Sequence, residues 1–349
     1  MKGPSLPAPR GEISRSLAST LRYGTPLPAL PHSLEDTDPY GDDLQIALYT
    51  LYELHYRGFA EVSDEREWDP GLLALRRPLE LRFLKALRGD VPTEADASQA
   101  LEALPLEPVG HDDTSVSHYL QRDGELWQLQ EYAALRSLYH LKEADPHAWA
   151  IPRLHGRAKA AMVAVEFDEF GAGHEEDIHA RLFADLMADL GLRTDYGHYV
   201  DAAPAEAVAT VNLMSLLGLH RALRGALVGH FAAVEVTSAP GSRRLAAALR
   251  RVGAGKAAQR FYDEHAEADA VHEQVVRRDV IGGLLDDEPE LEPDVAFGVR
   301  VTGLLEDRLA AHLLSAWKRR RSALRVPLAS VDRPGSAYVD NQAPLGTNS

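Results

Sequence analysis

Two histidines and an aspartate share one face of a predicted helix late in the chain. His265, Asp269 and His272 lie in the run Phe261-Tyr-Asp-Glu-His-Ala-Glu-Ala-Asp-Ala-Val-His272, which contains no proline or glycine. Because their spacing is i, i+4, i+7, a helix places the three side chains one above the next. Two imidazoles and a carboxylate on one stripe form part of a ligand set for a divalent transition metal. We therefore favour a metal site here over a solvated polar stripe.

Further candidate ligands occur on apolar segments earlier in the chain. Glu235 lies in the almost wholly apolar run Gly229-His-Phe-Ala-Ala-Val-Glu-Val-Thr. A buried carboxylate must be paired, coordinated or neutralised, so this position indicates a ligand. Glu169 ends a similar stretch. The candidate ligand set contains four carboxylates and three imidazoles: Glu143, Glu169, His179, Glu235, His265, Asp269 and His272.

Two interpretations of the segment before His179 remain open. A straight helix would place Glu169 and His179 about 80° apart, so the chain must break near the Gly171–Gly173 segment if both are ligands. Alternatively, Glu176-Asp-Ile-His179 has the Glu-x2-His spacing of ferritin-like diiron proteins. We favour Glu169, because it adjoins an apolar stretch whereas Glu176 lies among charged residues.

Other polar residues near these positions are expected to have structural roles. Glu166 is interpreted as a solvated position. Glu53 and His55 are two residues apart, so a helix points them to different sides, and both are expected at polar edges. His140 precedes Glu143 by three residues and is expected to contact that carboxylate rather than bind a metal.

Composition limits the classes of function. The chain of 349 residues contains no cysteine, which excludes disulfides, cysteine-ligated zinc or iron–sulfur clusters and thiol catalysis. Any metal must therefore be bound by histidines and carboxylates. The net charge of −16 argues against a nucleic-acid partner. No apolar run approaches the roughly 20 residues of a membrane span, and the N-terminus has no signal-peptide pattern, so no membrane partner and a cytoplasmic location are expected.

The first part of the chain divides into two regions by composition. Residues 1–40 are rich in proline and are expected to be a disordered lead. Residues 41–125 form a predicted helical N-terminal extension. It begins at Asp42 and includes two short helices, over 72–76 and 82–87.

The rest of the chain is densely helical. Apolar spacing predicts an all-α bundle over 126–322, and residues 323–349 are expected to be a flexible tail. No alternating strand pattern is present. The predicted helices cover 126–145, 156–170, 174–190, 205–217, 219–237, 241–252, 255–276 and 292–317.

The order and spacing of the seven candidate ligands resemble those of the haem-oxygenase-like diiron oxidases, often labelled iron-containing redox enzymes. Within that family the pattern is most similar to the central diiron domain of N-nitrosourea-forming N-oxygenases. The resemblance covers roughly residues 126–320. It implies a haem-oxygenase-like seven-helix bundle without haem, with Glu235 and one further carboxylate shared between or near two irons and Glu143 as an additional carboxylate.

The resemblance also implies a chemistry. Two Fe(II) ions per chain, for which manganese could substitute, would activate O2 through a peroxo-diiron(III) species and oxidise a small organic substrate. N-oxygenation is favoured, with oxidative C–C cleavage or decarboxylation as the other outcomes. The alternative function is a non-catalytic metal-binding or ferritin-like helical protein. A small-molecule substrate and a homodimer are the expected partners.

Overall fold

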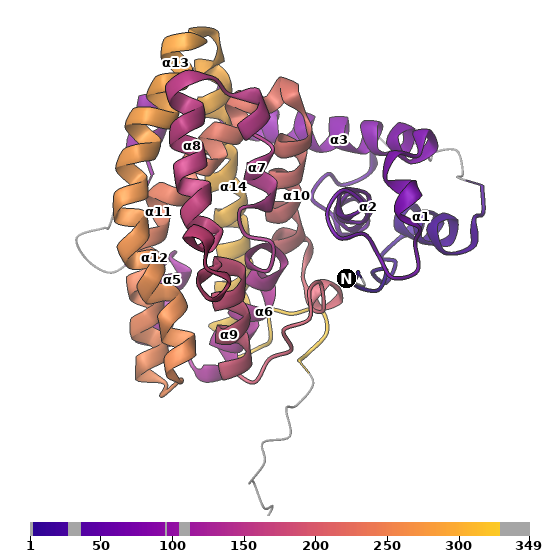
Figure 1. The fold of residues 1–349 in the computed structure, drawn as a ribbon. Coiled ribbons are helices and arrows are strands. Elements are labelled where there is room, and N and C mark those ends of the chain that lie inside the picture. The colour runs from indigo at the N-terminus through magenta and orange to yellow at the C-terminus, as the bar shows by residue number, and fades with distance from the viewer. Residues whose placement is uncertain (1–2, 27–35, 95, 105–111, 329–349) are drawn as a thin grey trace, which may run out of the picture.

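The described part of the chain consists of helices and the turns and loops between them (Figure 1). The computed structural model describes residues 3–26, 36–94, 96–104 and 112–328, without the side chains of 268–271. No strand occurs within these ranges, which confirms the predicted all-α class. Nor is any helix in the described ranges long and apolar enough to cross a bilayer.

The second half of the chain forms a bundle around α11. This helix packs against α12 and α14, and α9 packs against both α12 and α6. A π-helical turn, Val276–Ile281, follows α12 and leads into the short α13 (Gly282–Asp287). The main helices of the bundle are α6 (Leu126–His140), α8 (Gly156–Glu169), α9 (His179–Asp189), α10 (Ala205–Leu219), α11 (Arg224–Arg251), α12 (Lys256–Val275) and α14 (Glu292–Trp317).

Two glycines let α11 and α14 approach each other closely. A Cβ atom added at Gly229 would collide with the carbonyl oxygen of Val295, and one added at Gly298 would collide with that of Ala226. Only glycine, which has no Cβ atom, allows the two backbones to come this close. The contact fixes α11, which carries Glu235, against the last helix of the bundle.

The N-terminal region packs on one side of the bundle. In Figure 1, α1, α2 and α3 lie beside α10, and α2 contacts α10 directly. The short helices α4 and α5 instead pack on α14 and α11. The bounds of these helices are α1 (Glu12–Tyr23), α2 (Asp42–Glu53), α3 (Pro70–Asp90), α4 (Ala97–Glu102) and α5 (Val116–Arg122).

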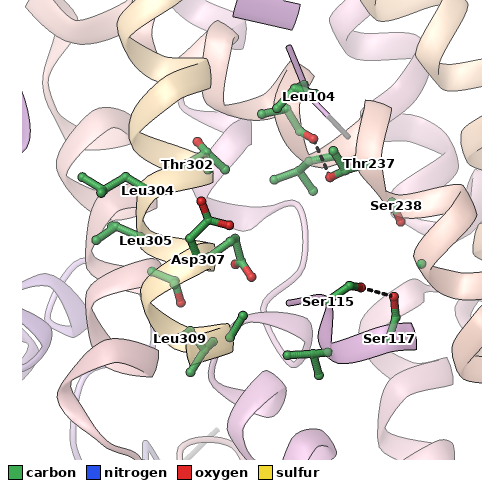
Figure 2. Close-up of a pocket in the computed structure, with 18 of the residues that line it drawn as sticks. Leu104, Ser115, Ser117, Thr237, Ser238, Thr302, Leu304, Leu305, Asp307 and Leu309 are labelled. Carbon is green, nitrogen blue, oxygen red and sulfur yellow. Dashed lines mark hydrogen bonds between the residues drawn. The ribbon is translucent and has the colours of Figure 1, made fainter. Parts of the chain in front are cut away.

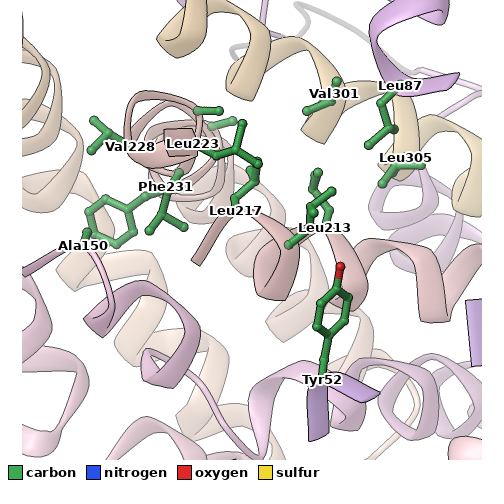
Figure 3. Close-up of a cluster of buried hydrophobic side chains, with 14 of the residues drawn as sticks. Tyr52, Leu87, Ala150, Leu213, Leu217, Leu223, Val228, Phe231, Val301 and Leu305 are labelled. Atoms are coloured by element: carbon green, nitrogen blue, oxygen red, sulfur yellow. The ribbon is translucent and has the colours of Figure 1, made fainter. Parts of the chain in front are cut away.

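One hydrophobic core joins this N-terminal region to the bundle. Figure 3 shows Leu87 of α3 close to Leu305 of α14, and Tyr52 of α2 pointing toward Leu213 of α10. All four side chains are almost fully buried. Because burial of such apolar side chains is the main favourable contribution to folding, the extension is part of the same folded unit as the bundle.

The expectation of a disordered lead over 1–40 is wrong for residues 3–26. Ile13, Leu17 and Leu21 recur at helical spacing and are buried on one face of α1. Asp43 accepts hydrogen bonds from the backbone N–H groups of Ile13 and Ser14, at 2.9 and 2.8 Å, which holds the start of α1 against α2. Residues 27–35 lie outside the described ranges.

Several predicted helix boundaries also differ. The two short helices expected in the extension are one helix, α3, which continues through Pro78. The helices predicted over 219–237 and 241–252 are likewise joined in α11, which continues through Pro240. The helix predicted over 126–145 ends at His140, and α7 (Asp145–Ala148) follows after a turn.

The start of the expected flexible tail is packed on the bundle. The backbone N–H of Ala323 donates to Glu131 at 3.0 Å, and that of Arg325 donates to the carbonyl oxygen of Ala202 at 2.9 Å. Ala323 and Leu324 are buried. The remainder of the predicted tail, residues 329–349, lies outside the described residues.

Candidate metal centre

Six of the seven predicted ligands converge inside the bundle. They come from the turn after α6, the end of α8, the first residue of α9, the middle of α11 and two positions of α12. Each is buried although each is polar or charged. The six are Glu143, Glu169, His179, Glu235, His265 and His272.

Their ligand atoms form two groups that share one residue. Glu143, Glu169, His179 and His265 make the first group, and Glu169, Glu235 and His272 make the second, with the ligand atoms of each group within 4.8 Å of one another. The Oε2 atom of Glu169 lies 2.7 Å from His179 Nδ1, and its Oε1 atom lies 3.8 Å from His272 Nδ1. One carboxylate oxygen thus faces each group. The shared position belongs to Glu169, whereas Glu235 falls in the second group only.

The break expected between Glu169 and His179 is present. The segment starts with a turn in which Gly171 and Gly173 have φ angles of 79° and 93°. A Cβ atom on Gly171 would lie 2.7 Å from the backbone nitrogen of Ile178, so the tight turn requires glycine there. The turn brings the end of α8 and the start of α9 together, which places both ligands in one group.

Glu176 does not take part in either group. It lies on the short turn Glu175–Asp177 and is exposed. The choice of Glu169 over Glu176 therefore agrees with the geometry, and the ferritin-like pairing of Glu176 with His179 does not form.

The side chain of Asp269 lies outside the described residues, so its role as a ligand stays a prediction. Its backbone belongs to α12, between the two histidines that enter the two groups.

The buried atoms of the centre suit a metal. The Oε2 atom of Glu143 has no hydrogen-bond partner among the described residues. His179 Nδ1 also has no hydrogen-bond partner within the described ranges, although it lies 2.7 Å from Glu169. Leaving buried polar atoms unpaired is costly unless another group satisfies them. Carboxylate oxygens with a few imidazoles are ligands that iron and manganese both accept.

His265 is oriented by its own helix. Its Nδ1 atom lies 2.8 Å from the carbonyl oxygen of Phe261, one turn earlier. Because a carbonyl oxygen only accepts, Nδ1 carries the hydrogen in the neutral ring, and Nε2 is the atom that would bind a metal. That Nε2 atom lies 3.6 Å from Glu143, inside the first group.

His272 contacts carboxylates through both ring nitrogens. Its Nδ1 atom lies 3.2 Å from Glu235 Oε2, within the second group. Its Nε2 atom lies 3.3 Å from Asp168 Oδ2, whose side chain is half exposed at the surface of α8. If Nε2 donates to Asp168, Nδ1 is left with its lone pair directed at Glu235 and Glu169. A carboxylate behind a ligating histidine fixes the ring in this way at many metal sites.

We expect Asp168→Ala to weaken metal binding at the second group by about 10- to 100-fold, because His272 loses the contact that sets its tautomer and orientation. Anaerobic titration with Fe(II) measures the change. Asp168→Asn keeps a side-chain oxygen that can accept from Nε2 and serves as the control. Equal affinity in the alanine variant and the unchanged protein would rule out this role.

The electrostatics of two carboxylates differ sharply. In the metal-free protein, burial disfavours the ionised form of Glu143, but the positive charges that His140 and His265 carry when protonated outweigh burial and hold the pKa of Glu143 well below its usual value. The His140 contact is direct, with Nδ1 2.8 Å from Glu143 Oε1, as the sequence predicted. Glu143 is therefore ionised at neutral pH, as a metal ligand must be.

Glu166, by contrast, was wrongly expected at a solvated position. It is buried on the inward face of α8, three residues before Glu169, and neither of its carboxylate oxygens has a hydrogen-bond partner within the described part of the chain. Burial, followed by the charges of Glu169 and Glu235, raises the pKa of Glu166 to about 9. Glu166 directly follows the apolar run 160–165, the same kind of signal that identified Glu235, so the sequence did contain an indication of its burial.

A cavity of about 710 Å³ borders the centre. His265, His140 and Phe261 form part of its wall, so the cavity reaches the first group. Figure 2 shows another part of the wall, where Thr302 of α14 lies across from Thr237 of α11. A cavity of this size, mostly apolar with a few polar groups, is suited to a small organic molecule.

No curated protein matches this chain. A family model described as iron-containing redox enzyme does match, over residues 130–307, which is about half of the 349 residues. The matched segment contains all six buried candidate ligands of the two groups. The chain therefore belongs to the iron-containing redox enzyme family and is an iron-dependent oxidoreductase.

Proposed function

We propose that the protein is a non-haem diiron oxidase or oxygenase that activates O2 to oxidise a small organic substrate. The observation that carries the proposal is the shared Glu169, whose two oxygens face two adjoining ligand groups. A single-metal site needs no such residue. A bridging carboxylate between two sets of carboxylates and imidazoles is the arrangement found in diiron proteins built on helix bundles.

Charge supports two divalent ions. Glu143, Glu169 and Glu235, together with the proposed ligand Asp269, supply four negative charges when all are ionised. Two Fe(II) ions neutralise them, whereas one ion leaves buried negative charge uncompensated. When bound, the iron pair supplies the electrons that reduce O2, and the hard carboxylate ligands stabilise the oxidised metal.

The protein's own residues orient the candidate ligands and form a cavity for the substrate. The ring of His265 is held by the carbonyl oxygen of Phe261, and that of His272 lies between Asp168 and Glu235, so both rings are in place before a metal arrives. The bordering cavity, which His265 helps to line, would hold the substrate next to the centre. We favour N-oxygenation of an amine or guanidine, on the ligand spacing, with oxidative C–C cleavage as the other outcome.

The proposed function does not involve haem. The carboxylates that face the interior would be unfavourable beside a porphyrin. We propose that the protein acts on a small-molecule substrate and has no nucleic-acid or membrane partner. We also propose that it is cytoplasmic and forms a homodimer.

The test is anaerobic titration of the metal-free protein with Fe(II), followed by rapid mixing with O2. We expect two irons per chain and a transient visible absorption band. One iron per chain, or two irons that do not react with O2, would contradict the proposal and favour a non-catalytic metal-binding protein. Replacing Fe(II) by Mn(II) in a parallel titration tests which metal the centre prefers.

A further inference from the structure

A fully buried ion pair connects the N-terminal extension to the turn that carries Glu143. The ammonium of Lys142 lies 3.0 Å from Glu53 Oε2, and the side chains are 1% and 0% exposed. Glu53 is the last residue of α2, and Lys142 directly precedes Glu143 in the turn after α6. The expectation that Glu53 lies at a polar edge is thus wrong.

Neighbouring groups from both regions satisfy this pair. The hydroxyl of Tyr196 donates to Glu53 Oε1 at 2.6 Å. The Lys142 ammonium also lies 4.1 Å from the centre of the Tyr56 ring, within the range of a cation–π interaction. A buried charge is tolerated when it is paired and hydrogen-bonded in this way, and removal of one partner leaves the other uncompensated.

The turn itself needs external support. Ala144, which follows Glu143, has a φ angle of 73°, a left-handed conformation that costs energy for a residue other than glycine. Such a conformation persists only where surrounding contacts hold it. Arg57, just beyond α2, provides a second contact by donating to the carbonyl oxygen of Leu141 at 3.0 Å.

Consecutive residues in this turn therefore face two different partners. Lys142 is directed at Glu53 in the extension, and Glu143 is directed at His140 and His265 in the metal centre. Because Lys142 and Glu143 are adjacent in the chain and the strained Ala144 follows them directly, a shift of Lys142 moves the carboxylate of Glu143. The first ligand group requires that carboxylate within 4.8 Å of its other ligand atoms.

We propose that the N-terminal extension positions the metal centre: Glu53, through Lys142, holds Glu143 in the first ligand group. Glu53 and Lys142 are positioning residues, since they act through the ligand and do not touch the metal. This inference rests on the proposed diiron function. It assigns to the extension a task in metal binding that no residue spacing within α2 indicates.

The test compares Glu53→Gln with a matched variant, Glu80→Gln. Glu80 is also a buried carboxylate that joins the extension to the bundle, since it lies 3.0 Å from His220, but neither residue adjoins a ligand. Anaerobic Fe(II) titration of each full-length, metal-free variant measures the number of sites and their affinities. Thermal unfolding of the same samples measures stability.

We expect Glu53→Gln to lose about 10-fold or more in affinity at one of two sites, as for other residues that orient a ligand. Glu80→Gln should keep both affinities even where its melting temperature falls. Two sites of unchanged affinity in Glu53→Gln, or equal loss in both variants, would overturn the inference. If Glu53→Gln does not fold, the double variant Glu53→Leu with Lys142→Met removes both charges together and is judged by the same criterion.

The two proposals fail in different ways. If the unchanged protein binds fewer than two irons, the diiron function fails whatever the variants do. If the unchanged protein binds two irons and Glu53→Gln does the same with equal affinity, only the positioning role of the extension fails.

Discussion

Glu169→Ala is expected to abolish iron binding at both positions of the centre, from two irons per chain to none at micromolar Fe(II). Glu169 is the residue common to the two ligand groups, and each of its oxygens faces one of them. Loss of the shared carboxylate would remove one ligand from each group and one negative charge from the centre. Both effects weaken iron binding, so we expect the affinity at each position to fall by more than about 100-fold. This exceeds the fall expected when the replaced residue only orients a ligand.

Two further variants make this prediction specific. Glu235→Ala should remove binding at one position and leave the other, because Glu235 belongs to the second group only. Glu176→Ala alters an exposed carboxylate on the same connection between α8 and α9 and should bind two irons. Retention of one tight site in Glu169→Ala would show that the carboxylate is not shared. Circular dichroism of the metal-free variants checks that each is folded.

The residues that form the two groups could be identified from the sequence because their signal is local. His265 and His272 fall on one face of α12 by helical spacing alone, and an acidic residue within the apolar run of α11 marks Glu235. The glycines between Glu169 and His179 also indicated a break in the helix, and this break brings those two residues together. In each case the residue type and a few neighbours were sufficient.

Interactions between distant segments could not be predicted in the same way. Glu53 and Lys142 are 89 positions apart, and each alone resembles a surface charge on a helix. Which ligand is shared between the groups depends on how α8, α9 and α12 meet, not on spacing within any one of them. The helix α1 is a different case, because its apolar spacing was visible but the surrounding prolines suggested disorder.

Glu166 is a buried carboxylate for which the structure predicts a large effect on the stability of the metal-free protein. Its pKa is raised to about 9 in the folded chain, first by burial and then by the charges of Glu169 and Glu235, from an ordinary value of 4.5. Between these pH values the folded state holds a proton that the unfolded state releases. The contribution of Glu166 is therefore most favourable below pH 4.5, and stability falls as the pH rises toward about 9.

Glu166→Gln should stabilise the metal-free protein at neutral pH. Glutamine is uncharged at every pH, so the variant does not take up a proton on folding. At pH 7 the gain is about 3 kcal/mol, from about 1.4 kcal/mol for each pH unit above the ordinary pKa. Urea unfolding at pH 5, 7 and 9 measures it, with the exposed Glu176→Gln as the control. A gain that does not grow between pH 5 and pH 9 would contradict the raised pKa.

The same proton connects Glu166 to metal binding. Cations placed beside Glu169 and Glu235 oppose the negative charges that help to raise the pKa of Glu166, so metal binding should release its proton near neutral pH. Titration with Fe(II) in a weakly buffered solution should then release more protons from the unchanged protein than from Glu166→Gln, by up to about one per chain. Equal release from both proteins would mean that Glu166 stays protonated beside the bound metal. A protonated carboxyl group there contributes no charge, and the other carboxylates alone would balance the two ions.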